Sequence, residues 1–223
     1  METTKDPVFI TGGTGYVGKR LIKILLDEGF PVTALARPQS KQKLPAGCVP
    51  VIADPFDPSS YVNSIPAKSI FVHLLGVGHP GPKKKLLFYS VDLASLKASV
   101  EAAKQANVKH LVYMSVAQYP TKIMADYQDA RRQGEEAIIT SGIVSTFIRP
   151  WYIVGPGHYW PLLFTPIFKL LEVIPSTAVQ ARSLALVSLK QMLFTLKKVI
   201  SNTPKATNNI IEIHDIKKML KNR

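Results

Sequence analysis

Four glycines lie within seven positions, from Gly12 to Gly18, between two apolar segments. The first segment, residues 8–10, fits a buried strand. In the second, residues 21–26, the apolar side chains fit one face of a helix that ends at Glu28 and Gly29, with glycine where a C-terminal cap belongs. The sequence therefore predicts a strand, a tight glycine turn and a helix at the start of the chain.

Such a turn is suited to a dinucleotide. Glycines let the backbone approach a pyrophosphate closely, and the helix N-terminus directs free N–H groups and the positive end of its dipole at the phosphates. The glycines satisfy both a G-x-G-x-x-G and a G-x-x-G-x-x-G spacing, and their strand–helix context favours binding over a purely structural turn. The candidate cofactor-binding residues here are Thr11, Gly12, Gly13, Thr14, Gly15, Tyr16, Val17 and Gly18.

Length and composition limit the remaining possibilities. The 223 residues, 46% of them hydrophobic, suffice for one domain with a substantial core. The single cysteine, Cys48, excludes an internal disulfide framework, and no metal site is predicted. No signal peptide precedes the first strand, so a cytoplasmic location is expected. The net charge of +13 favours anionic ligands, but no nucleic-acid motif is present, and we expect no nucleic-acid partner.

Strands and helices alternate after the glycine turn. Such alternation requires crossover connections and predicts an α/β fold, a doubly wound parallel sheet of the Rossmann type with helices on both faces. Further strands are expected at residues 31–36, 49–53, 69–75, 110–114 and 144–148. Helices are expected at 88–106, with Asn107 as the C-terminal cap, and at 124–140. We expect a single domain, 1–223, in which residues 151–223 add a small substrate-side cap, a helix at 188–200, a final strand at 209–213 and a basic tail.

Residues 161–174 are strongly apolar apart from a narrow stripe formed by Thr165, Lys169 and Glu172. The segment is too short and too charged to span a bilayer. We expect it to cover the substrate pocket and to present its surplus apolar surface to a second copy in a homodimer or, as a peripheral contact, to an anionic membrane.

Arg37 stands about twenty residues past the glycine turn, where the dinucleotide motif normally has an acidic residue that binds a ribose hydroxyl. No acidic residue occurs between Glu28 and Asp54. An arginine can bind a 2′-phosphate through two parallel hydrogen bonds, with Ser40 and Lys41 nearby, so the sequence favours NADP(H), with NAD less likely. The alternative is that Arg37 is a solvated loop residue.

Asp54 directly follows the strand at 49–53. Its carboxylate either accepts a hydrogen bond from the adenine amino group or caps the turn at residues 58–60, and the sequence leaves both roles open.

Several motifs together resemble the short-chain dehydrogenase/reductase superfamily, in its atypical, NAD(P)H-binding, epimerase-like branch. They are residues 11–18, the strand end at Leu75, Gly76 and Val77, the pair Tyr127-x-x-x-Arg131, and Arg149-Pro150 with Gly155-Pro156-Gly157. The resemblance implies that Leu75, Gly76 and Val77 border the cofactor and that Pro150 flanks the nicotinamide. It also implies hydride transfer between NADPH and a small carbonyl or alcohol substrate.

In that superfamily a Tyr-x-x-x-Lys pair is catalytic: the tyrosine acts as acid or base, and the lysine binds the nicotinamide ribose and lowers the tyrosine pKa. Tyr127 and Arg131 stand four residues apart and therefore share a helix face, where a cation would stabilise a tyrosinate. An arginine will not release a proton, which argues against a relay through it. The alternative for Arg131 is a helix ion pair with Glu135.

A second departure concerns the family's catalytic serine or threonine, because Ala117 occupies the corresponding position. Ser115 or Gln118 would have to donate the hydrogen bond, and we retain Ser115 as the third catalytic candidate. Two functions therefore stay open: an NADP-dependent oxidoreductase, and a non-catalytic NADPH-binding redox sensor or assembly factor. Sugar-nucleotide epimerisation is less favoured because the region after residue 148 is short.

Overall fold

The computed structural model describes residues 5–78, 80–119, 124–159, 185–204 and 208–221. Their main sheet has seven strands in the order β3-β2-β1-β4-β5-β6-β9, and all six pairings are parallel. The strands are β1 (Val8–Thr11), β2 (Val32–Ala36), β3 (Val49–Ile52), β4 (Ile70–His73), β5 (His110–Met114), β6 (Ser145–Ile148) and β9 (Asn209–Ile211). The chain winds outward from β1 in both directions, which confirms the predicted doubly wound Rossmann-type sheet.

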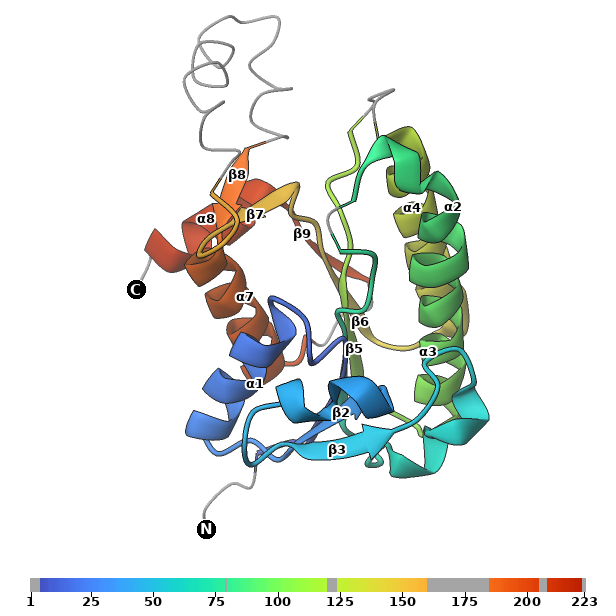
Figure 1. Ribbon diagram of the computed structural model, residues 1–223. Coiled ribbons are helices and arrows are strands. Elements are labelled where there is room, and N and C mark those ends of the chain that lie inside the picture. The colour runs from blue at the N-terminus through green and yellow to red at the C-terminus, as the bar shows by residue number, and fades with distance from the viewer. Residues whose placement is uncertain (1–4, 79, 120–123, 160–184, 205–207, 222–223) are drawn as a thin grey trace, which may run out of the picture.

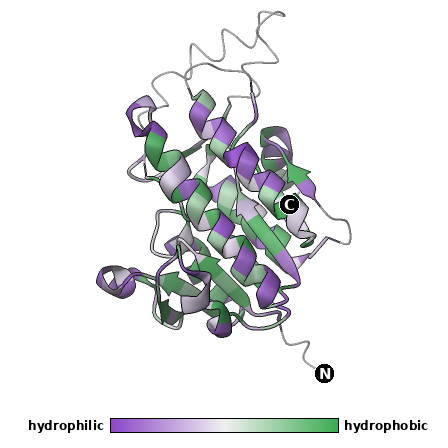
Figure 2. Ribbon diagram, turned by 90° about the vertical axis from the view of Figure 1, so that its right-hand side faces the viewer, coloured by the Kyte–Doolittle hydropathy of each residue, from purple (hydrophilic) through white to green (hydrophobic). Residues whose placement is uncertain are grey.

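Helices cover both faces of this sheet (Figure 1). Helices α1 (Gly18–Asp27), α7 (Leu189–Ser201) and α8 (Ile213–Lys221) lie on one face, and α3 (Ala94–Gln105) and α4 (Ala125–Ser141) lie on the other. Each face has its own hydrophobic core, with Leu21 and Leu196 in the first and Leu96 and Ile138 in the second. Figure 2 views the α3–α4 side, where hydrophilic and hydrophobic stretches alternate along the helices, as expected for amphipathic elements.

The helix expected at residues 88–106 is present, but its first part is not regular α-helix. The short helix α2 (Lys85–Leu87) leads into a π-helical turn, Phe88–Leu93, and only then into α3. Asn107 follows with a positive φ of 53°, which confirms it as the C-terminal cap. Single π-helical turns are rare and frequently lie at functional sites.

The C-terminal part of the chain required two corrections. The final strand ends at Ile211, and the expected basic tail is an amphipathic helix, α8, whose residues Ile213 and Ile216 are buried. The strands β7 (Tyr152–Val154) and β8 (Leu186–Ser188), which the sequence did not predict, form a small parallel sheet of their own. Residues 161–174 lie outside the described residues, so the contacts expected of them stay predictions.

Candidate functional site

A pocket of about 240 Å³ opens at the carboxyl ends of the central strands. It lies beside β1, where strand order reverses, and this switch point is where open α/β sheets bind ligands. The glycine turn, the ends of β2 and β4, the loop after β3 and the π turn line it through Gly12, Thr14, Gly15, Leu35, Ala36, Arg37, Pro55, Phe56, Leu74, Leu75, Gly76 and Val91. Six of the predicted cofactor residues are in this lining: Gly12, Thr14, Gly15, Arg37, Leu75 and Gly76.

The glycines of the turn are required by close backbone approaches. Gly12 has a φ of 75°, and a Cβ there would lie 2.6 Å from the carbonyl carbon of Leu74. A Cβ on Gly18 would collide with the carbonyl oxygen of Gly12, so only glycine lets α1 pack against the turn. Gly13 is likewise buried, against Ile22 of α1 and Ala34 of β2.

The N-terminus of α1 is left open beside this turn. Val17 at the N-cap makes no side-chain capping bond, and the first turn holds no acidic residue. Helix α7, by contrast, begins with a complete capping box between Ser188 and Gln191. The amides of Lys19 and Arg20 already bond to the Gly15 and Val17 carbonyls, but no side chain covers this end of the helix, so the positive end of the α1 dipole is suited to a phosphate.

Two other residues of the motif face away from the pocket. Thr11 is fully buried, and its hydroxyl is hydrogen-bonded to Nδ1 of His73 at 2.9 Å. The Tyr16 ring lies 4.2 Å from the His158 ring and 4.5 Å from the Arg20 guanidinium. Burial raises the pKa of Tyr16, and among the described residues its hydroxyl has no partner. Thr11 and Tyr16 therefore support the turn instead of lining the pocket.

Arg37 is exposed at the edge of the pocket, at the start of the short 3-10 helix Pro38–Lys43. Asp54 does not line this pocket; it borders an adjoining open groove that also contains Arg37. Its Oδ1 accepts a hydrogen bond from the amide of Phe56 at 2.9 Å. The turn at Pro58–Ser60 is capped by Asp57, which accepts from the amide of Ser59 at 3.0 Å, so the alternative capping role for Asp54 is wrong.

A buried ion pair adjoins the pocket wall. Nη2 of Arg131 lies 2.8 Å from Oδ2 of Asp92, and the two side chains are only 7% and 1% exposed. The other carboxylate oxygen accepts a hydrogen bond from the Val77 amide at 2.6 Å. Nη1 of Arg131 donates to the Tyr113 hydroxyl at 3.3 Å and to the Met114 carbonyl at 3.1 Å. Burial raises the pKa of the Asp92 carboxyl, although Arg131 and the Val77 amide oppose the rise.

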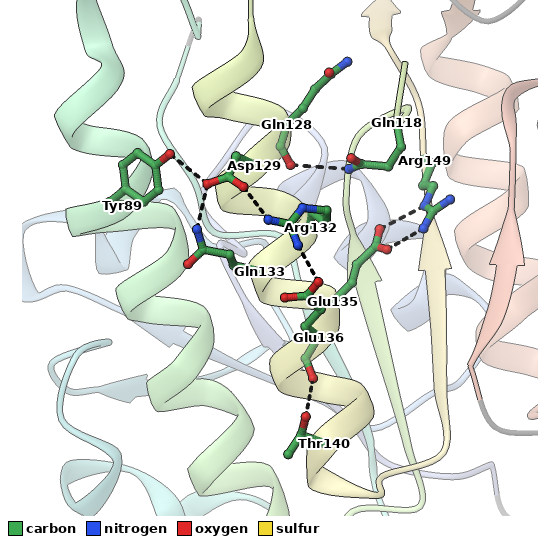
Figure 3. Close-up of polar contacts among 10 residues, drawn as sticks. All are labelled: Tyr89, Gln118, Gln128, Asp129, Arg132, Gln133, Glu135, Glu136, Thr140 and Arg149. Carbon is green, nitrogen blue, oxygen red and sulfur yellow. Dashed lines mark hydrogen bonds and ion pairs between the residues drawn. The ribbon is translucent and has the colours of Figure 1, made fainter. Parts of the chain in front are cut away.

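Asp92 was not among the predicted site residues, and the alternative prediction of an Arg131–Glu135 ion pair is wrong. Glu135 pairs with Arg149 instead, as Figure 3 shows. Only one sequence feature pointed to Asp92: it is an acidic residue between Val91 and Leu93, on a helix face expected to be apolar.

Tyr127 lies on the same face of α4 as Arg131, as predicted. Its ring centroid lies 4.9 Å from that of Phe88 and 5.1 Å from the Arg131 guanidinium, so the arginine meets the face of the ring. Tyr127 is half-buried, and none of the described residues makes a hydrogen bond with its hydroxyl. Neither Tyr127 nor Arg131 is among the residues that line the pocket.

Ser115 is not placed to act as a donor to a substrate. It is 3% exposed, its hydroxyl is buried without a partner among the described residues, and its amide donates to the Ile148 carbonyl. The neighbouring Ala117 is tied to buried Pro150, whose carbonyl accepts from the Ala117 amide at 3.1 Å. Pro150 does not line the pocket.

Two glutamines form hydrogen bonds between the loop after β5, at residues 117–118, and α4. Gln128 donates from Nε2 to the Ala117 carbonyl at 3.1 Å, and Gln118 donates to the Gln128 carbonyl at 3.5 Å (Figure 3). The sequence analysis missed Gln128, because the contact joins two elements that no local spacing relates.

Two kinds of feature are absent from the described ranges. No three His, Cys, Asp or Glu side chains there are grouped so that they could hold a metal ion. No helix in the same ranges has both the length and the apolar character needed to cross a bilayer.

The sheet order, the glycine turn and the open helix N-terminus at the switch point together define a Rossmann-type dinucleotide-binding protein. Residues 12–157 match the family model described as NAD(P)H-binding, and the chain belongs to that family. The resemblance to short-chain dehydrogenases/reductases is thereby confirmed.

Curated relatives are similar over part of their length. Ceramide reductase of Caulobacter vibrioides is 27% identical over 154 residues, covering 67% of this chain and 47% of the relative. A putative dihydroflavonol 4-reductase of Synechocystis is 24% identical, covering 74% and 54%. The photosystem II assembly factor Ycf39 of Cyanophora paradoxa is 24% identical, covering 64% and 44%. The chain thus spans about half the length of these relatives.

Solved structures share the fold at low identity. The Bordetella bronchiseptica enzyme WbmG in complex with NAD superposes with a TM-score of 0.70 at 17% identity, covering 99% of this chain and 79% of that one. A UDP-galactose 4-epimerase gives a TM-score of 0.68 at 16% identity, covering 92% and 77%.

Proposed function

We propose that the protein binds NADP(H) and transfers hydride between the nicotinamide and a small carbonyl or alcohol substrate. The observation that carries the proposal is the position of Tyr127, whose ring stands against Arg131 while Arg131 adjoins Gly76 in the pocket wall. A tyrosine that is joined to the pocket wall through one arginine is a candidate for general acid catalysis. The relatives named as reductases support the same class of reaction.

Within this proposal, Tyr127 donates a proton to the substrate oxygen as hydride arrives at carbon. Arg131 places a positive charge against the tyrosine ring. The bound cofactor supplies the hydride. Leu75, Gly76 and Val77 border it, and Pro150 lies on the nicotinamide side.

The preference for NADP(H) rests on Arg37. Its side chain is exposed at the pocket edge, and no acidic residue between Glu28 and Asp54 is present to repel a 2′-phosphate. A guanidinium there can bind that phosphate through paired hydrogen bonds.

The oxidation of NADPH by a panel of carbonyl compounds tests the reaction. With an active substrate, Tyr127→Phe should lower turnover by about 10²–10⁴-fold and leave NADPH affinity unchanged, because the phenol acts on the substrate in the transition state. Tyr89→Phe is the matched control, since Tyr89 also faces α4 but its hydroxyl bonds to Asp129 (Figure 3). Unchanged turnover in Tyr127→Phe would contradict the mechanism.

A second candidate function is a non-catalytic NADPH-binding redox sensor or assembly factor. It is favoured by Ala117 in place of the family's hydroxyl residue and by the commitment of Arg131 to Asp92. The relative named as a photosystem II assembly factor supports this candidate. NADPH binding without oxidation across the whole panel, and with no effect of Tyr127→Phe on any readout, would favour it over the oxidoreductase.

A cytoplasmic location and a contact through residues 161–174 belong to the same proposal. Light scattering checks whether the protein is a homodimer, and cosedimentation with anionic vesicles checks for a peripheral membrane contact. If the protein is a monomer and does not bind such vesicles, covering the pocket is the one role that remains of those proposed for residues 161–174.

A further inference from the structure

We propose that Arg131 and Asp92 form a positioning pair for the cofactor: they hold the pocket wall at residues 75–77, and Arg131 acts on NADPH through this wall without touching the nicotinamide ribose. The inference rests on the NADP(H) binding of the proposed function. It gives the arginine a different task from the lysine that the family resemblance places there.

The π-helical turn brings the participants together. Phe88, Val91 and Asp92 all come from this one turn. Phe88 packs on Tyr127, Val91 lines the pocket, and Asp92 reaches Arg131. The wider turn therefore connects the candidate proton donor, the pocket and the buried ion pair.

Three of the five N–H donors of Arg131 are committed. Nη2 donates to Asp92, and Nη1 donates to the Tyr113 hydroxyl and the Met114 carbonyl. Nε is buried and has no partner among the described residues. The side chain is only 7% exposed, and drawing it toward a ribose would leave Asp92 without its cation in a buried site, which is strongly unfavourable.

Asp92 connects the ion pair to the pocket wall. Its Oδ1 holds the Val77 amide at 2.6 Å, a short charge-assisted hydrogen bond. A Cβ at Gly76 would lie 2.5 Å from Nη2 of Arg131 and 3.3 Å from the Asp92 carboxylate, so the backbone of residue 76 rests directly on the ion pair. Leu75 and Gly76 line the same pocket as Arg37, which marks this wall as belonging to the adenosine half of the site.

Affinities for two probes separate the positioning role from direct contact. NADPH occupies the whole cofactor site, whereas adenosine 2′,5′-bisphosphate occupies only the adenosine half. Both are titrated by calorimetry into the full chain and into the variants Asp92→Leu, Arg131→Met and the double variant. The controls Glu136→Leu and Arg132→Met remove an exposed ion pair of α4.

If the pair positions the wall, each single variant should weaken both probes by about tenfold to a hundredfold, the equivalent of a hydrogen bond to a charged group. The double variant should bind both probes as weakly as the singles, because the two residues act as a unit. Its melting temperature should nevertheless exceed those of both singles, since no lone charge is left buried. The controls should bind like the unmodified protein.

Two results would overturn the inference while leaving the proposed function intact. Loss of NADPH affinity in Arg131→Met with unchanged bisphosphate affinity would show direct contact with the nicotinamide half. Recovery of affinity along with melting temperature in the double variant would show a purely structural pair. If the single variants fail to fold, the double variant alone is the test. Weak binding by it supports the positioning role, and binding like that of the unmodified protein contradicts it. An unmodified protein that binds neither probe would instead overturn the proposed function, and this inference with it.

Discussion

The guanidinium of Arg149 forms two hydrogen bonds with the carboxylate of Glu135, from Nε to Oε1 at 3.0 Å and from Nη2 to Oε2 at 2.5 Å (Figure 3). The pair joins the end of β6 to α4. Nη1 of Arg149 also reaches Glu212, just after β9, at 2.9 Å. One arginine thus links three elements that are distant in the sequence.

Removing this arginine should destabilise the fold. Arg149→Met leaves the Glu135 side chain, which is 5% exposed, without its cation, and we expect a loss of about 3–5 kcal/mol in the free energy of unfolding by urea. Arg132→Met is the control on the same helix, where the exposed pair with Glu136 should contribute little. Equal effects of the two substitutions would contradict the prediction.

Arg37 should determine which dinucleotide binds. Its bidentate contact with a 2′-phosphate should contribute about 1.5–3 kcal/mol, so NADPH should bind at least tenfold more tightly than NADH, and Arg37→Asp should abolish or reverse the preference. Lys43→Asp makes the same charge change on the same short helix but outside the pocket lining, and it should preserve the preference. Equal affinities of the unmodified protein for the two cofactors, measured by calorimetry, would refute this role.

Gly18→Ala should weaken both the fold and the binding of NADPH. Helix propensity alone would make alanine better than glycine by about 1 kcal/mol. The added methyl group, however, would overlap the Gly12 carbonyl oxygen, and α1 would have to move away from the turn that holds the phosphates. Gly78→Ala meets no atom within 4 Å and should change neither melting temperature nor affinity. A Gly18→Ala protein as stable as its parent would show that the turn adapts.

Acidification should destabilise the protein through two buried histidines. Burial, aided by Arg131, lowers the pKa of His73 from 6.5 to about 3, and burial, aided by Lys109, lowers that of His110 from 6.5 to about 4. Below pH 6.5 both histidines take up protons in the unfolded chain, whereas in the folded protein they stay neutral until the pH nears their lowered pKa values. The stability is therefore fully present above this pH and is lost as the pH falls toward the folded pKa values.

The histidines can be distinguished by substitution. His110→Gln keeps a possible bond to Thr146 and should flatten the dependence of unfolding free energy on pH between about 6.5 and 4. His214→Gln, at a side chain that is 80% exposed, should leave the slope unchanged. The measurement is urea unfolding across this pH range, and equal slopes for the His110 and His214 variants would contradict the assignment.

The sequence predicted those elements that a short stretch of residues specifies by itself. The strand–turn–helix around Gly12, the apolar strands and the cap at Asn107 follow from spacing and backbone conformation along one short stretch. The ion pair between Asp92 and Arg131 could not be found in this way, because its members lie on different helices and the π turn that orients Asp92 has no recognised sequence pattern. The i,i+4 spacing suggested Glu135 as the partner of Arg131, whereas in the folded chain Glu135 pairs with Arg149 and Arg131 pairs with Asp92.

Helix α8 was missed for a different reason. Its basic residues suggested a solvated tail, whereas Ile213, Ile216 and Met219, three residues apart, form an apolar stripe that packs on the core.

The parallel order of the sheet has a consequence for how the chain is made. Strand β1 leaves the ribosome before β2 and β4, and Val8 pairs with Ile70 as well as with Val32, so the centre of the sheet cannot form until β4 is made. Folding that depends on such distant pairings is slow compared with the closing of local hairpins. The outer edge of β6 waits about as long, because Thr146 pairs with Asn209 in β9. Chains released before β9 is synthesised would carry β6 as an open edge, able to pair with the same edge of another unfinished chain.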